Sequence, residues 1–143
     1  MAELPGGELF AIVSTSGNAD NVLYRSTSDF STWDPAAVKN PFALQVSGGL
    51  LYVAQPSGVA RSDAAGASFT VMPGTEAIAN PTFTFNSAGT MLASSPGHAL
   101  YACDGSICTA MGDRTLAAAG MRIFSDDRLL SGAYLSTAPT TDW

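Results

Sequence analysis

Residues 40–56 read NPFALQVSGGLLYVAQP and residues 80–96 read NPTFTFNSAGTMLASSP, and the two segments align without a gap at an offset of 40 residues. Both begin with Asn-Pro and end with Pro, and Ser and Gly recur between these ends at matching places. These residue types dictate turns, so the matches mark the same chain reversals in both copies. The sequence therefore predicts a repeated, turn-rich unit.

A second recurrence closes each unit, because a Ser at the end of a short apolar strand is followed seven residues later by an aromatic residue. The pairs are Ser26 with Trp33, Ser62 with Phe69, and Ser136 with Trp143. In the third unit Cys103 takes the position of the Ser. We interpret the chain as one β-repeat domain, 1–143, of four units with approximate bounds 8–36, 40–73, 80–112 and 114–143.

Short segments of alternating or continuous apolarity predict the strands of each unit. One type of strand is expected at 9–14, 50–54, 91–94 and 128–132, and the anchor strand that ends in Ser or Cys follows it across a hairpin turn. The only helical pattern is one turn at 114–120. The first unit is expected to lack its first strand, because Leu9 aligns with the second strand of the later units.

The anchor segments resemble the Asp-box, or BNR repeat, whose pattern Ser-x-Asp-x-Gly-x-Thr-Trp forms a β-hairpin in a propeller blade. Residues 62–69, SDAAGASF, keep the Ser, the Gly, a hydroxyl residue and the aromatic, with Asp63 one place early. Residues 26–33, STSDFSTW, keep the Ser, Thr and Trp, with Asp29 one place late. The resemblance implies an all-β fold, a small propeller-like array of about four antiparallel blades, in which the box builds the fold and generally lies away from an active site.

The composition argues against several classes of function. Charged residues make up 13% of the chain, the net charge is −6, and no two basic residues are adjacent. Binding to nucleic acid or to anionic lipid needs a basic patch, so neither partner is expected. No signal peptide is expected, and no apolar run approaches the ~20 residues that span a bilayer. The protein is expected to be made in the cytoplasm and to act in a virion or outside the cell after release.

An enzyme is the alternative interpretation, because Asp-box proteins include sialidases, which use an Arg cluster, a Tyr nucleophile with a Glu partner and an Asp acid/base. Arg25 and Arg61 occupy the same place in successive units, however, and this favours a role at the blade edge. Asp126 and Asp127 are adjacent, as in a turn, and a strand would point them to opposite faces. The one histidine, His98, lies in a Pro-Gly turn. We therefore expect no catalytic, cofactor-binding or metal-binding residues.

Six side chains are candidates for contact with a glycan or a protein partner, and two cysteines for a disulfide. The partner candidates are Tyr24, Tyr52, Tyr101 and Tyr134, which recur about once per unit, together with Arg25 and Arg61. Tyrosines stack on sugar rings, although tyrosines at repeat positions also form the core between blades. Cys103 and Cys108 either form a short-loop disulfide across a hairpin or stay as buried thiols.

The predicted function is a non-enzymatic structural or binding module, of the kind found in bacteriophage tails, baseplates or head decorations. Such a module docks on other protein chains, as a homo-oligomer or with other virion components, or binds a surface glycan. The alternatives are a reduced glycosidase or sialidase-like enzyme domain and a secreted lectin-like propeller. The ring closes either within one chain or by pairing with another chain.

Overall fold

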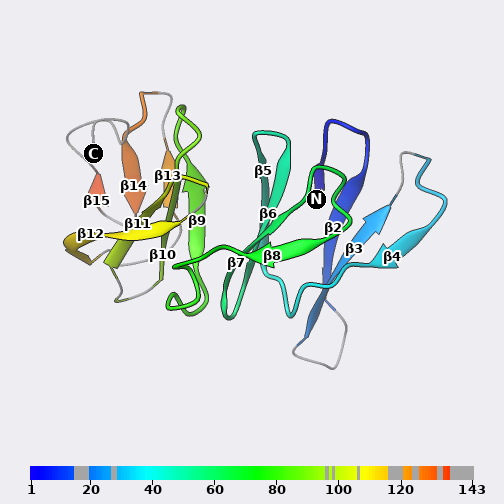
Figure 1. Cartoon of the computed structure of the whole chain (residues 1–143), viewed down its shortest axis with the longest axis horizontal. Helices are drawn as coiled ribbons and strands as arrows, with labels where there is room; N and C mark the ends of the chain where they lie inside the picture. The colour runs from blue at the N-terminus through cyan, green and yellow to red at the C-terminus, as the bar shows by residue number, and fades with distance from the viewer. Residues whose placement is uncertain are drawn as a thin grey trace. The chain divides into compact units, whose positions relative to one another are not determined.

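The computed structural model describes residues 1–14, 20–26, 29–95, 97, 99–105, 107–115, 121–123, 126–131 and 134–135. Every regular element within these ranges is a β-strand, and all the strand pairs are antiparallel, so the all-β prediction is confirmed. The chain divides into two compact units, Met1–Val71 and Met72–Trp143. Each unit holds two sheets, and their strands follow one another in chain order (Figure 1).

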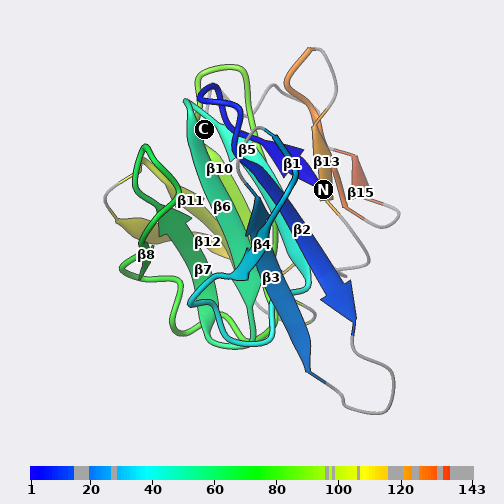
Figure 2. The same ribbon diagram turned by 90° about the vertical axis from the view of Figure 1, so that its right-hand side faces the viewer.

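The first unit contains two four-stranded sheets. The first sheet consists of β1 (Ala2–Glu3), β2 (Leu9–Ser14), β3 (Asn21–Ser26) and β4 (Trp33–Pro35). The second sheet consists of β5 (Ala43–Ser47), β6 (Leu50–Gln55), β7 (Gly58–Ser62) and β8 (Phe69–Val71). Figure 2 shows β2 and β3 running side by side as the hairpin at the centre of the first sheet.

The second unit contains a four-stranded sheet and a three-stranded sheet. The third sheet consists of β9 (Thr82–Phe85), β10 (Met91–Ser94), β11 (Ala99–Cys103) and β12 (Cys108–Thr115). The fourth sheet consists of β13 (Met121–Ile123), β14 (Leu129–Ser131) and β15 (Tyr134–Leu135). The strands expected at 9–14, 50–54, 91–94 and 128–132 are therefore present as β2, β6, β10 and β14.

One expectation from the sequence, the missing first strand of the first unit, is wrong. The first sheet does have a first strand, because Ala2 and Glu3 pair with Phe10 and Leu9. A strand of two residues shows no alternation, so the hydrophobic pattern did not reveal it. In the segment 114–120, where a helical turn is expected, β12 continues to Thr115, and the rest of that segment lies outside the described residues.

The ladder register assigns residues to the two faces of each sheet. The face that carries the anchor residue (Ser26, Ser62 or Cys103) is called face B. The opposite face, which carries the residue just before the anchor, is called face A. In the fourth sheet the anchor, Ser136, lies outside the described residues, and Leu135 before it defines face A. Side chains alternate between the faces along every strand.

The core of each unit joins face A of one sheet to face B of the next. In the first unit, Phe10 and Leu23 of face A form a buried cluster with Leu51 and Val53 of face B. In the second unit, the corresponding cluster joins the third and fourth sheets. It consists of Leu92 and Leu100 of face A and Met121 and Leu129 of face B. The same two faces therefore meet in both units.

Asp63 organises the turn between β7 and β8. Its Oδ1 accepts the backbone N–H of Ala67 at 2.8 Å, and its Oδ2 accepts the N–H and the hydroxyl of Ser68 at 3.1 and 2.7 Å. Gly66 has a φ of 64°, which glycine adopts without strain. These hydrogen bonds, with that from the Ser68 hydroxyl first, lower the pKa of the Asp63 carboxyl.

Asp63→Asn should lower the unfolding midpoint at neutral pH by a few degrees, because one of the two carboxylate acceptors is lost. Since the folded-state pKa of Asp63 lies below its ordinary value of 3.8, its stabilising contribution is complete above that value and is lost as the pH falls through the folded-state pKa. The difference between the parent and Asp63→Asn should therefore shrink on acidification. Thermal unfolding followed by circular dichroism over a pH series measures this difference in unfolding midpoint.

The control for the change in net charge is Asp34→Asn, at an exposed position on β4. A difference between Asp63→Asn and the parent that stays constant down to strongly acidic pH would contradict the assignment of the turn to the Asp63 carboxylate.

Candidate functional site

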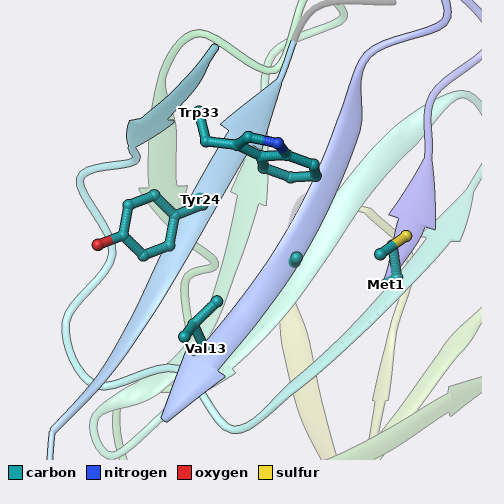
Figure 3. Close-up of a pocket in the computed structure, with 5 residues that line it drawn as sticks. Met1, Val13, Tyr24 and Trp33 are labelled. Atoms are coloured by element: carbon teal, nitrogen blue, oxygen red, sulfur yellow. The ribbon is translucent and has the colours of Figure 1, made fainter. Parts of the chain in front are cut away.

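A shallow depression lies on face B of the first sheet (Figure 3). It has a volume of about 390 Å³ and is lined by Met1, Ala11, Val13, Tyr24 and Trp33. The register places Ala11 opposite Tyr24 on β2 and β3, and Trp33 opposite the anchor Ser26 on β3 and β4. Four neighbouring segments of the first sheet therefore contribute side chains to one surface.

The chemistry of this surface is almost entirely apolar. Val13 is 45% exposed and Trp33 is 37% exposed, and none of the lining side chains carries a charge. Figure 3 shows the Tyr24 hydroxyl pointing away from the other labelled side chains. Sites that bind a small polar ligand need several convergent polar groups to fix its orientation. This depression is therefore better suited to an apolar protein surface than to a sugar.

The equivalent surface of the second sheet is covered. The ladders equate Trp33 with Phe69, since each pairs with the anchor Ser of the preceding strand. Phe69 packs edge-to-face against Phe10 of the first sheet, with ring centroids 6.3 Å apart and an interplanar angle of 80°. The first sheet thus presents a similar apolar face, but leaves it exposed.

The four candidate tyrosines are not brought to one site. Tyr24 lines the depression, and Tyr101 occupies the equivalent position of the third sheet. Tyr52 lies on the second strand of its sheet rather than the third and is only 7% exposed, in agreement with a core role. Tyr134 lies in β15 at the position equivalent to Tyr24, and its side chain is outside the described residues.

The two candidate arginines lie on face A, away from the depression. Nη2 of Arg25 is 3.8 Å from Oε1 of Glu8, which makes a long ion pair at a partly exposed position. Arg61 is half-buried and pairs with Tyr52 in the β6–β7 ladder. Their matching places confirm that the repeat positions them in the same way, and their contact with a partner stays a prediction.

Cys103 and Cys108 pair across the β11–β12 ladder and form a disulfide bond. Of the two alternatives open from the sequence, the structure therefore has the disulfide. The register places this bond where the second sheet has Ser62 and Phe69. The disulfide thus takes the place of the Ser–aromatic pair of the box. Disulfides persist mainly in oxidising compartments.

Asp126 and Asp127 lie in the turn before β14, as the sequence indicates. Oδ2 of Asp126 accepts a hydrogen bond from Nε of Arg128 at 2.7 Å, and this bond lowers the pKa of the Asp126 carboxyl. The Asp127 carboxylate accepts the N–H of Ser87 at 2.7 Å and also the Ser87 hydroxyl. Asp126 therefore stabilises the turn before β14, whereas Asp127 joins this turn to the turn between β9 and β10, 40 residues away in the sequence.

Within the described ranges, no group of three or more His, Cys, Asp or Glu side chains could hold a metal ion. Across the same ranges, no helix has the length and apolarity needed to cross a membrane. His98 lies outside the described residues.

The exposed face was missed at the sequence level because only Tyr24 of its five residues was a candidate. The sequence of β2, LFAIVS, could have indicated this face, because it is apolar on both sides of the strand. Such a run is typical of a strand that is covered on both sides. Comparison with known proteins finds no matching family model, curated protein or solved structure.

Proposed function

We propose that the chain is a non-enzymatic structural or binding module, a small propeller-like array of β blades that docks on other protein chains through face B of its first sheet. One observation carries this proposal: the face is apolar, with Val13 45% and Trp33 37% exposed, whereas the matching face of the second sheet is packed. Contiguous exposed apolar surface in a folded protein marks an interaction site.

The propeller-like architecture is supported by three features. Each of the first three sheets has four antiparallel strands in chain order, as blades have. Face A of one sheet packs on face B of the next in both units. The turn held by Asp63 occupies the position of the Asp-box between the third and fourth strands of its sheet.

A virion is the setting we propose, with the chain as a tail, baseplate or head-decoration protein of a bacteriophage. The low charged fraction of 13% and the Cys103–Cys108 disulfide support a small stable protein that ends up outside a reducing cytosol. Fold alone does not decide function, so the setting is an analogy with such particle components. Glycan binding is the weaker alternative, because the depression offers few polar groups.

Mass spectrometry of gradient-purified particles that carry the encoding genome tests the setting. We expect the chain at a fixed copy number per particle, and several-fold lower incorporation of Trp33→Ser. The matched control is Ile107→Ser, which removes an apolar side chain that is 55% exposed and lies outside the depression. Absence of the chain from the particles would overturn the setting.

Enzymatic and lectin functions are tested separately on the intact chain. We expect no hydrolysis of a panel of chromogenic glycosides, including a sialoside, and no binding on a glycan array. Turnover would establish the enzyme alternative, and array binding that Trp33→Ser abolishes would establish a glycan as the ligand of this face.

A further inference from the structure

A small pocket lies on face B of the second sheet, within the first unit and separate from the depression on the first sheet. It has a volume of about 280 Å³. Ala60, Phe69 and Val71 line it from the β7–β8 ladder, and Lys39 lines it from the segment that links β4 to β5. Pockets for drug-sized ligands begin at about 300 Å³, so this pocket suits a smaller molecule.

Two further polar side chains, Gln55 and Ser57, contribute to the lining of the pocket. Gln55 is only 7% exposed, and its amide is held at both ends. Its Oε1 accepts the backbone N–H of Lys39 at 3.3 Å, and its Nε2 donates to Oγ of Ser57 at 3.3 Å. Since Ser57 is the acceptor in this bond, its own hydroxyl hydrogen is available to a ligand.

Lys39 brings a positive charge to the pocket. In the part of the chain that the structure describes, no carboxylate lies within ion-pair distance of its ammonium group. The backbone that carries it is held on both sides, by Gln55 and by the next residue, Asn40, whose Oδ1 accepts the N–H of Asn21 at 2.9 Å. The lysine side chain therefore extends from a fixed point beside Gln55.

The pocket combines hydrogen-bond donors with apolar surface. The Lys39 ammonium and the Ser57 hydroxyl both donate, and an ionised carboxylate is a group that only accepts. Hydrogen bonds between an ammonium and a carboxylate are among the stronger ones in proteins. The side chains of Ala60, Phe69 and Val71 are apolar. The lining therefore matches a carboxylate attached to a compact apolar group.

We propose that this pocket binds a small organic monocarboxylate, with its carboxylate on Lys39 and Ser57 and its apolar part against Phe69. Gln55 is a positioning residue, because its amide contacts the backbone of Lys39 and the hydroxyl of Ser57. The inference goes beyond the proposed function and is independent of it, since the pocket and the depression on the first sheet share no lining residue.

An NMR titration of the 15N-labelled full chain with phenylacetate tests the site. Phenylacetamide, which has the same ring but no charge, is the matched neutral probe, and the ionic strength is held constant because salt screens an exposed charge. We expect phenylacetate to shift the amide signals around Lys39 and Ser57 in a saturable way. Phenylacetamide should bind about ten-fold more weakly, the effect of losing a hydrogen bond between charged groups.

Substitutions of the two donors provide the second measurement. Lys39→Met keeps most of the side-chain length without the charge and should raise the dissociation constant for phenylacetate about ten-fold. Ser57→Ala should raise it to a smaller extent. The control for net charge is Arg122→Met, at an exposed position on β13, and it should keep the parent dissociation constant.

The amine of Lys39 can also be observed directly, because the chain has no other lysine. Reductive methylation with 13C-formaldehyde keeps the charge, and the methyl signal of Lys39 should move with phenylacetate but not with phenylacetamide. Equal binding of the two probes, an unchanged dissociation constant in Lys39→Met, or shifts that do not saturate would each overturn the proposal.

Discussion

Phe10→Ala is expected to lower the free energy of unfolding of the first unit by about 3–5 kcal/mol, the range found when a buried phenylalanine is truncated to alanine. Phe10 is fully buried and is the largest side chain of the cluster that joins the first two sheets. Its ring packs on Phe69 and against Gly66, where a Cβ would overlap it. The loss therefore combines the transfer of the ring to water with a cavity between the sheets.

Urea denaturation followed by near-ultraviolet circular dichroism measures this effect. The control is Phe30→Ala in the same unit, because Phe30 is 55% exposed and leaves no cavity. It should change the free energy of unfolding by less than about 1 kcal/mol. Equal losses for the two variants would contradict the assignment of Phe10 to the interface between the first and second sheets.

The repeated strands could be predicted because their apolar residues and turn residues recur. Asn-Pro and Pro bracket both residues 40–56 and 80–96, and the strands at 50–54 and 91–94 lie in the expected places. The faces could not be assigned in the same way. Leu51, Tyr52 and Val53 are all buried, so composition alone does not separate face A from face B. Only the ladder register makes that distinction.

The box aromatics illustrate the limit of sequence reasoning for the site. Trp33 and Phe69 both follow an anchor Ser by seven residues, and the sequence treats them alike. Phe69 packs on Phe10 of the first sheet, whereas Trp33 of the first sheet is 37% exposed. Whether such a residue is buried or exposed depends on which sheet packs against its face, which is a property of tertiary structure.

In the second unit, the backbone at Gly74 lies very close to the backbone of Cys108. The φ of Gly74 is 87°, and an added Cβ would lie 2.5 Å from the carbonyl oxygen of Cys108, at the start of β12. The N–H of Cys108 also donates to the carbonyl of Pro73 at 3.0 Å. A side chain at position 74 therefore has to displace the backbone that carries the disulfide.

Gly74→Ala should accordingly lower the free energy of unfolding by about 3 kcal/mol, since left-handed strain of about 1–2 kcal/mol adds to the cost of overpacking against backbone. Gly89→Ala isolates the strain, because Gly89 has a φ of 81° and no atom within 4 Å of the added Cβ. We expect Gly89→Ala to cost about 1 kcal/mol, with the unfolded chain's lower entropy offsetting part of the strain. Urea titrations of both variants measure the difference. Equal urea midpoints for Gly74→Ala and Gly89→Ala would show that β12 can shift away from the added methyl group at little cost. The contact of residues 73–74 with Cys108 would then contribute little to the stability of the third sheet.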